Sequence, residues 1–408
     1  MCPAAVILSI ITWPDRSSAS SGRLTDPKRL KRDVLATTTS MIMADGWKAE
    51  DKIFPVNAGY IQTMSLLAID VGAGTQDILL YDPEVPLEGS TKMILPSQTV
   101  LVGNRINRAR MMGRDIFLCG PTMGGGSFTA AVRWHLAAGL KVFATASAAA
   151  TINDDLEKVA ALGIVICEEA PSKALEVKTG DIDIAALQKA FSLFDLDLPQ
   201  DIAVAVQDHG FSPHSSNRLY RFECLAQAIR SGGSLKDFAY RDPPQNMTRM
   251  LAVQSTLKDA GFQPLLMDTG PAALFGAALD LDDEKPALVI NFGNGHTVAA
   301  VLAAGRITGI FEHHTSEISP EKLSRLVREL CQGTIKSSEV FQDGGHGAYV
   351  ESIPGKVEKI LVTGPRRQSF LSCGAIPGSV AASPAGDMMI TGCIGLLEAW
   401  KKREELWR

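Results

Sequence analysis

The chain has 408 residues, of which 46% are hydrophobic and 21% charged, and its formal net charge is −5 at pH 7. This length and apolar content can bury more than one hydrophobic core, so two domains are expected. The negative charge offers no basic face for nucleic acid, and no apolar run approaches the roughly 20 residues that a membrane-spanning helix needs. We therefore expect a cytoplasmic protein that binds neither nucleic acid nor a membrane.

Residues 1–63 differ from the rest of the chain. An apolar stretch at 3–13 lacks the preceding positive charge of a secretory signal, and a Ser-rich segment and a basic cluster at 28–32 follow it. Met64 directly precedes the first apolar strand pattern. We predict that residues 1–63 are a non-core extension, that 64–283 form a first domain, and that 284–408 form a second.

A glycine-rich pattern occurs twice, at residues 66–81 and 287–302. Each copy runs from an apolar strand through a short turn with two glycines into a second apolar strand, which predicts a β-hairpin. Glycine permits backbone angles closed to other residues, and it leaves the backbone N–H groups open to a ligand. Two such hairpins that face each other would clamp an oligophosphate. The alternative is that both are ordinary hairpins that need glycine for a tight turn.

Between the hairpins, apolar strand patterns alternate with amphipathic helix patterns. Strands are predicted at 115–120, 141–144, 164–167 and 202–206, and helices at 128–140, 154–162, 184–193 and 218–231. This alternation favours an α/β architecture with a largely buried sheet. After the second hairpin, the patterns predict a helix at 320–331, a strand at 359–362 and a closing helix at 389–403.

Five motifs, in this order, resemble those of the actin, sugar-kinase and heat-shock-chaperone ATPase superfamily. They are a first phosphate motif at 70–77, a first connecting helix at 268–276, a second phosphate motif at 291–297, an adenosine motif at 359–365, and a second connecting helix at 390–395. The ordered set is more specific than any single motif. The resemblance implies an α/β fold of two ribonuclease-H-like domains around an interdomain nucleotide cleft, with ATP and Mg²⁺ as cofactors.

The whole chain also resembles a prokaryotic family labelled "putative pyruvate formate-lyase activating enzyme". A radical-SAM activase needs three closely spaced cysteines to hold an iron–sulfur cluster. The seven cysteines here are scattered, and none belongs to a Cys-x-x-Cys pair. The spacing therefore predicts neither a disulfide framework nor a radical-SAM activase.

Two positions depart from the superfamily pattern. Asn291 stands where an acid is common, so one magnesium–water contact is weakened or supplied elsewhere. The adenosine motif has Gly364 and Pro365 in place of two glycines, and proline contributes no N–H. Recognition of the base is therefore the least defined part of the site.

The resemblance implies a role for each residue of the phosphate motifs. Phosphoryl transfer depends on positioning and on charge neutralisation by Mg²⁺, which carboxylates hold directly or through water. Asp70 and Asp77 are the candidates for organising this ion and the attacking water; in the alternative, Asp70 caps the turn and Asp77 faces solvent. The remaining contacts with the nucleotide are assigned to Gly72, Gly74, Thr75, Gly293, Asn294, Gly295, Thr297 and Gly364.

Five of the seven histidines fall in three segments interpreted as loops, at 206–218, 309–315 and 343–347. Loops of this kind line the sites of cleft-type enzymes. Asp208, at the end of a strand, is the candidate general base, with Asp268 as second choice. The side chains expected to contact an acceptor are His209, which is also a catalytic candidate, His214, Arg218, His313 and His314.

Other interpretations of these segments stay open. Each imidazole alone could simply hydrogen-bond within a wall, and imidazoles beside carboxylates suit zinc or iron. The Met123–Gly126 segment could present a helix N-terminus to an anion or serve only as a flexible connection.

Three functions follow: a kinase acting on a small metabolite, an ATPase that activates or repairs a partner enzyme, and a non-catalytic nucleotide sensor. Asp70 and Asp77 argue against the sensor. The sequence does not separate the first two functions, and it identifies neither the acceptor nor the oligomeric state.

Overall fold

The structure is a computed structural model, and it describes residues 65–279, 281, 285–353 and 355–406. The extension expected at 1–63 lies outside the described residues. Among the helices described, none is long and apolar enough to cross a bilayer.

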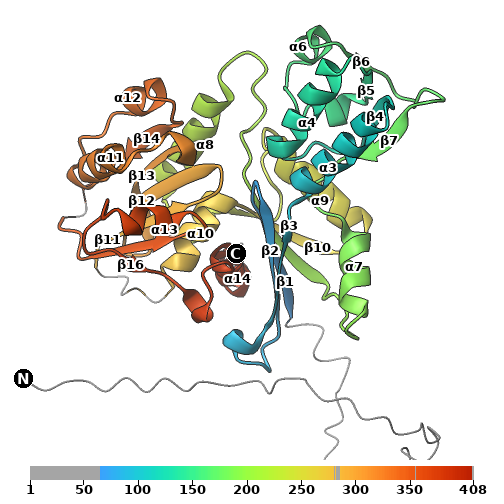
Figure 1. Cartoon of the computed structure of the whole chain (residues 1–408). Helices are drawn as coiled ribbons and strands as arrows, with labels where there is room; N and C mark the ends of the chain where they lie inside the picture. The colour runs from blue at the N-terminus through green and yellow to red at the C-terminus, as the bar shows by residue number, and fades with distance from the viewer. Residues whose placement is uncertain (1–64, 280, 282–284, 354, 407–408) are drawn as a thin grey trace, which may run out of the picture. The chain divides into compact units, whose positions relative to one another are not determined.

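The first predicted hairpin opens a six-stranded sheet of order β3-β2-β1-β8-β10-β9 (Figure 1). Its strands β1, β8 and β10 run parallel, while β2 and β3 are antiparallel to their neighbours. Strand β8 is an almost continuous apolar run because its residues 202–206 are completely buried. The strands are β1 (Leu66–Val71), β2 (Thr75–Tyr81), β3 (Thr91–Pro96), β8 (Asp201–Val206), β9 (Ala239–Tyr240) and β10 (Gln263–Asp268).

The second hairpin opens a sheet of the same design, with the order β14-β13-β12-β11-β15-β16. Strands β11, β12 and β13 pair antiparallel, whereas β11, β15 and β16 run parallel. The strands are β11 (Ala287–Phe292), β12 (His296–Ala303), β13 (Arg306–His314), β14 (Gly347–Val350), β15 (Lys359–Thr363) and β16 (Val380–Ala381).

The two sheets repeat one topology. In each, three consecutive antiparallel strands begin at the glycine hairpin, and the hairpin's first strand is flanked on its other side by two parallel strands. Apart from one additional edge strand in each sheet, β9 in the first and β14 in the second, the order is 3-2-1-4-5. This is the ribonuclease-H-like arrangement, and its duplication defines the fold of the actin and sugar-kinase superfamily. The expected fold class is confirmed.

A smaller parallel sheet is inserted between β3 and β8, and it has its own apolar core. Its order is β6-β5-β4-β7, and Figure 1 shows it with its helices beside the first hairpin. Its elements are β4 (Ile116–Cys119), β5 (Val142–Ala144), β6 (Ile164–Ile166), β7 (Leu175–Lys178), α3 (Gln98–Met111), α4 (Gly126–Ala137), α5 (Ala146–Ala149) and α6 (Leu156–Ala161).

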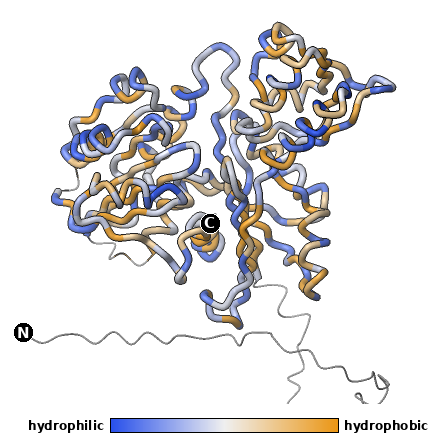
Figure 2. Tube along the Cα trace, viewed as in Figure 1, coloured by the Kyte–Doolittle hydropathy of each residue, from blue (hydrophilic) through white to orange (hydrophobic). Residues whose placement is uncertain are grey.

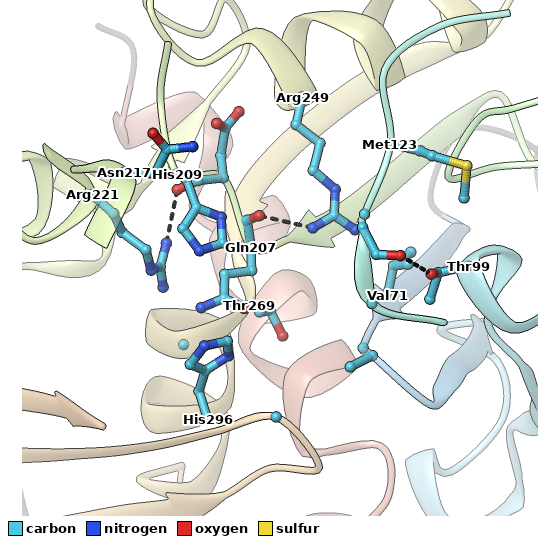
Figure 3. Close-up of a pocket in the computed structure, with 18 of the residues that line it drawn as sticks. Val71, Thr99, Met123, Gln207, His209, Asn217, Arg221, Arg249, Thr269 and His296 are labelled. Carbon is cyan, nitrogen blue, oxygen red and sulfur yellow. Dashed lines mark hydrogen bonds between the residues drawn. The ribbon is translucent and has the colours of Figure 1, made fainter. Parts of the chain in front are cut away.

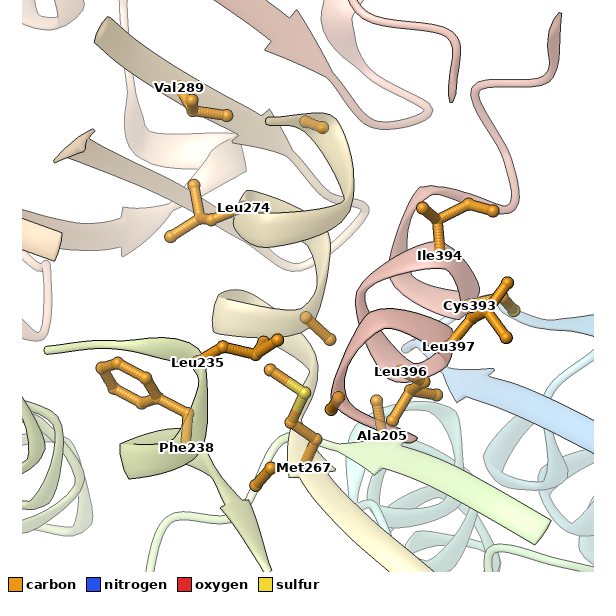
Figure 4. Packing of buried hydrophobic residues seen from close by; sticks show 14 of the residues in the cluster. Ala205, Leu235, Phe238, Met267, Leu274, Val289, Cys393, Ile394, Leu396 and Leu397 are labelled. Carbon is orange, nitrogen blue, oxygen red and sulfur yellow. The ribbon is translucent and has the colours of Figure 1, made fainter. Parts of the chain in front are cut away.

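Two helices, α10 (Thr269–Ala277) and α14 (Thr391–Lys401), pack against each other within the largest core cluster (Figure 4). A Cβ on Gly276 would lie 1.8 Å from the Thr391 carbonyl oxygen, and a Cβ on Gly395 would lie 2.0 Å from that of Ala272. Only glycine permits this close crossing. Figure 2 shows the hydrophobic segments gathered on these helices and on the strands of the sheets.

The remaining helices cover the sheets or lead into the site. They are α7 (Ile184–Ser192), α8 (Asn217–Ser231), α9 (Thr248–Asp259), α11 (Pro320–Gln332), α12 (Ser337–Gln342), α13 (Arg367–Ser372) and α15 (Arg403–Leu406). Short 3₁₀ turns lie at Leu87–Gly89, Leu235–Phe238, Thr315–Glu317 and Pro384–Gly386.

Candidate functional site

The turns of the two hairpins have the same backbone hydrogen bond and face each other. The Gly72 N–H donates to the Thr75 carbonyl over 2.8 Å, and the Gly293 N–H donates to the His296 carbonyl over 2.9 Å. A Cβ on Gly74 would lie 3.0 Å from the side chain of Asn294. Two chemically different segments, far apart in sequence, are thus held turn to turn.

The turn glycines do not adopt unusual backbone angles, and they differ in whether the fold has room for a side chain in their place. None of the four has a positive φ, so the expectation that these turns use angles closed to other residues is wrong. A Cβ on Gly293 would lie 2.7 Å from the His296 carbonyl oxygen, which explains that glycine. A Cβ on Gly295 would meet nothing nearer than the Ala73 Cβ, at 3.7 Å. The fold therefore does not require glycine at 295, and open access to the backbone is the remaining physical reason for it.

Both turns line one cavity of about 540 Å³. Its wall also includes the glycine-rich segment that precedes α4, the residues that follow β8, and the first turns of α8, α9 and α10 (Figure 3). The predicted site residues found in this wall are Gly72, Asp208, His209, Arg218, Gly293, Asn294, Gly295 and His314.

Several predicted nucleotide contacts do not reach the cavity. Thr297 is completely buried, and its hydroxyl hydrogen-bonds that of Thr315 at 3.1 Å. Gly364 has a φ of +92°, and a Cβ there would lie 2.4 Å from the Phe292 carbonyl oxygen, so it packs against β11. Gly74 and Thr75 are also outside the cavity wall.

Asp77, which is buried, and Asp70, which is half-buried, form a carboxyl pair beside the cavity. They are register partners across β1 and β2, so both side chains lie on one face. Asp70 accepts a hydrogen bond of 2.5 Å from the Thr269 hydroxyl, and its carboxylate packs against Gly392 at the start of α14. Asp77 is only 9% exposed, so the alternative in which it faces solvent is wrong.

Burial disfavours charge on both members of this pair. It raises the pKa of Asp70 to about 7, and burial together with the Asp70 carboxylate raises the pKa of Asp77 to about 8. Within the described chain, the Oδ1 atom of Asp77 has no hydrogen-bond partner. A cation would relieve both the desolvation and the repulsion.

The two candidate general bases have structural partners instead. Asp208 accepts hydrogen bonds of 2.8 Å from the backbone N–H groups of Gly210 and Met250, one on each carboxylate oxygen. Asp268 caps α10 through the Gly270 N–H and forms an ion pair with Arg221. Both carboxylates are therefore held in place by the protein, and the geometry does not support the expected role of either as a free base.

Arg221 is the centre of a buried charge network that the sequence did not predict. Its guanidinium is 2% exposed and pairs with Asp268 at 2.5 Å and with Glu312 at 2.9 Å. Gln207 donates a further hydrogen bond of 2.7 Å to Glu312. Burial is the largest single influence and acts to raise the pKa of Glu312, but the charge and hydrogen bonds of Arg221 and the neighbouring His346 and His296 together outweigh it and lower this pKa to about 2. Glu312 is therefore ionised at neutral pH.

Four histidine rings gather in the cavity: His209, His296, His314 and His346. The centroid of the His296 ring lies 4.7 Å from that of the His314 ring and 4.8 Å from that of the His346 ring. Burial lowers the pKa of His296 to about 4 and that of His346 to about 3, and it also lowers the pKa of His209. These three rings are neutral at pH 7.

Two of the histidines expected in the cavity lie elsewhere. His313 is completely buried, and its ring nitrogens contact the carbonyl oxygens of His314 and Asp343 at 3.2 and 3.1 Å. The reason is that residues 309–314 belong to β13 and not to a loop, so His313 points away from the face that carries Glu312 and His314. His214 is exposed and does not line the cavity.

His296 and His346 were not predicted as site residues, although both lay in segments that were singled out. His296 pairs with His314 across β12 and β13, and the His346 backbone N–H donates to Glu312. The position of His296 carried a usable signal, because it corresponds in the second turn to Thr75 in the first.

The topology and the facing turns define an α/β protein of the actin and sugar-kinase superfamily. The chain belongs to the family described as "Putative pyruvate format-lyase activating enzyme (DUF1786)", whose model matches residues 123–369. In the described part of the chain, the cysteines are free and form no group that could hold an iron–sulfur cluster. No curated protein matches the chain in sequence.

Solved structures that share low sequence identity were also found. The ethanolamine utilization protein EutJ from Carboxydothermus hydrogenoformans is 14% identical, over 81% of this chain and 88% of that chain, with a TM-score of 0.30. MreB5 of Spiroplasma citri bound to ADP is 10% identical, over 84% and 99%, with a TM-score of 0.34. Component A of the Acidaminococcus fermentans (R)-2-hydroxyglutaryl-CoA dehydratase is 11% identical, over 83% and 99%, with a TM-score of 0.29. The fold assignment rests on the sheet topology and not on these likenesses.

Proposed function

We propose that the protein binds ATP with Mg²⁺ at the two facing turns and transfers the terminal phosphoryl group to a small acceptor in the cavity. The observation that carries this proposal is the pair of matched glycine turns at one cavity. Each turn keeps the same hydrogen bond, yet Gly295 is a glycine that the backbone does not need.

The turns have the chemistry that phosphate requires. In the described structure, the backbone N–H groups of Ala73, Asn294 and Gly295, which all line the cavity, have no hydrogen-bond partner. Successive free N–H groups in a tight turn form a concavity that binds anions. Phosphate oxygens at these turns would receive donors from both halves of the molecule.

The donor set beside the first turn fits Mg²⁺. This ion prefers oxygen ligands and is commonly held by one or two carboxylates together with phosphate and water. Asp70 and Asp77 would hold it directly or through water, and the unpartnered Oδ1 of Asp77 is a free ligand atom. When bound, the ion supplies charge neutralisation for the phosphate oxygens.

The part of the cavity wall around Arg218 suits a small polar acceptor. Arg218 lines it, donates a hydrogen bond of 2.7 Å to the Gly345 carbonyl, and lies over the ring of Phe341. Among the described residues, no carboxylate pairs with this guanidinium. Arg249, by contrast, is neutralised by Asp181 at 2.7 Å. The positive charge of Arg218 therefore favours an acceptor that carries an anionic group.

Two substitutions in the second turn test nucleotide binding. Gly295→Ala should leave the melting temperature unchanged, because its Cβ has room, while it obstructs the approach of phosphate to the backbone. We expect at least a tenfold loss of Mg·ATP affinity in calorimetry, which corresponds to about 1.4 kcal/mol. Gly293→Ala is the matched control, since it must shift the His296 carbonyl and should lower the melting temperature. If the unmodified protein binds no Mg·ATP at millimolar concentration, the proposal is wrong.

Isotope transfer tests the reaction itself. The protein is incubated with ATP labelled in the terminal phosphate, with and without a metabolite extract. Label in a small organic molecule supports phosphoryl transfer to an acceptor. Release of labelled phosphate alone indicates an ATPase, and binding without turnover indicates a nucleotide sensor; either result would overturn the kinase proposal.

A further inference from the structure

Three of the cavity histidines come from separate parts of the chain and present ring nitrogens to one another. His209 follows β8 of the first sheet, His296 begins β12 of the second, and His346 precedes β14. One ring nitrogen of each lies within 4.8 Å of the others, and His209 and His296 approach from opposite sides of the cavity (Figure 3). We propose that these three histidines bind a divalent transition-metal ion, with a further coordination position open to the cavity.

Unpartnered nitrogen atoms support a ligand at this place. His346 is completely buried, and neither of its ring nitrogens has a hydrogen-bond partner within the described chain; the Nε2 atom of His296 also lacks one. Buried polar groups are hydrogen-bonded in the great majority of cases, because leaving one without a partner costs free energy. A metal ion satisfies these nitrogens together.

The charges around the three rings also favour a cation. The buried network of Asp268, Glu312 and Arg221 carries one more negative than positive charge. One of its members, Glu312, places its Oε2 atom 3.8 Å from the Nδ1 atom of His346. A carboxylate behind a metal-bound histidine is the usual outer partner, and it orients the ring and raises its basicity. Arg221 and Gln207 hold Glu312 in that position.

The ligand set indicates which ions fit. Imidazole suits zinc, iron, copper and nickel, whereas Mg²⁺ prefers oxygen. Tetrahedral zinc with bonds of about 2.0 Å places neighbouring nitrogens about 3.3 Å apart, so the ring nitrogens, which now lie within 4.8 Å of one another, must move closer on binding. Three protein ligands with one open position are typical of catalytic zinc sites and not of structural ones.

The open position gives this site a role in the proposed reaction. It faces the same cavity as Arg218, so a hydroxyl or carbonyl oxygen of the acceptor would bind the ion there. This role rests on the proposed function. The metal site itself does not rest on the proposed function, because its ligands are histidine side chains, whereas phosphate would bind to the backbone N–H groups of the turns.

Metal titration of the untagged full chain tests the site. After chelator treatment, the protein is titrated with Co²⁺, whose visible absorption reports its coordination, and Zn²⁺ is used in competition. We expect about one ion per chain. His296→Ala and His346→Ala should each weaken Co²⁺ binding by more than about 100-fold, which is the most that losing a residue behind a metal ligand usually costs. His214→Ala is the matched control, because that ring is exposed and outside the cavity, and it should bind Co²⁺ normally.

Folding and nucleotide binding are measured on the same samples. Circular dichroism shows whether each variant folds, and His209→Ala, at a less buried position, serves if His346→Ala does not. An unmodified protein that binds neither Co²⁺ nor Zn²⁺ at micromolar concentration, or equal losses in the control, would overturn the metal site. Co²⁺ binding without ATP binding supports the metal site and refutes the proposed function, and ATP binding without Co²⁺ binding does the reverse.

Discussion

The two glycine hairpins share a backbone but differ in chemistry. Across β1 and β2, the first hairpin pairs Asp70 with Asp77, whereas the second pairs Asn291 with Val298 at the corresponding positions. The residue that closes the turn is Thr75 in the first and His296 in the second. Because the turn is fixed by a main-chain hydrogen bond, its side chains are free to differ. The duplicated fold thus presents carboxylates on one side and imidazoles on the other.

This difference has a consequence for stability. The carboxyl pair of the first hairpin resists ionisation, since burial raises the pKa values of Asp70 and Asp77 to about 7 and about 8. The second hairpin carries no such pair. A buried carboxyl group that is costly to ionise lowers the stability of the fold near neutral pH. Its presence there is therefore better explained by a functional role than by folding.

The largest expected effect comes from placing an acid in the second hairpin. Val298 is 3% exposed, and its register partner across β12 and β13 is the ionised Glu312. Val298→Asp would bury a second negative charge directly opposite the first, and we expect it to lower the free energy of unfolding by about 3 kcal/mol or more. Urea denaturation measures this loss. Val298→Asn, with a similar shape but no charge, should lose clearly less; equal losses would show that polarity and not charge is responsible.

A smaller effect of opposite sign is expected from removing an acid in the first hairpin. The folded state holds the Asp77 proton more tightly than the unfolded chain, so this stabilisation is full at low pH and is lost as the pH rises toward about 8. Asp77→Asn removes that loss. In Mg²⁺-free buffer at pH 8.5, the variant should be more stable than the unmodified protein by about 1 kcal/mol or more.

The pH dependence separates this effect from a general one. At pH 5 the unmodified protein and Asp77→Asn should differ less, because Asp77 then keeps its proton. Glu84→Gln, on an exposed side chain, is the control and should show no such dependence. Parallel stability profiles for Asp77→Asn and the unmodified protein between pH 5 and 8.5 would contradict the raised pKa. The same substitution should weaken Mg·ATP binding.

Local patterns in the sequence predicted the hairpins well. Strand periodicity and turn glycines act over a few residues, so β1–β2 and β11–β12 could be recognised before their sheets were known. The order of the motifs then predicted the duplicated fold. Helix α8 and strand β8 were also found, β8 because it is a short continuous apolar run and α8 because its apolar residues recur at helical spacing.

The histidine cluster could not be predicted in the same way, because it depends on pairing between strands. Treating residues 309–315 as a loop placed His313 and His314 together, whereas strand alternation separates them. Strand β14, which brings His346 to Glu312, was not predicted at all. Likewise, nothing in the local sequence shows that Arg221 on α8 reaches Glu312 on β13.

The smallest expected effect on stability comes from making the second turn resemble the first. His296→Thr keeps the turn, because the hydrogen bond from the Gly293 N–H is accepted by the main-chain carbonyl of residue 296, and the first turn already has threonine at this place. Threonine is also well suited to the start of a strand. We expect a change in the free energy of unfolding within about 1 kcal/mol, together with loss of Co²⁺ binding. The converse change, Thr75→His, should not create a metal site, because Thr75 hydrogen-bonds Asp77 and is not among the residues that line the cavity with the histidines. Strong destabilisation by His296→Thr would show that His296 supports the fold. Unchanged Co²⁺ binding would place the ion elsewhere. In either case the two hairpins would differ less in function than their side chains suggest.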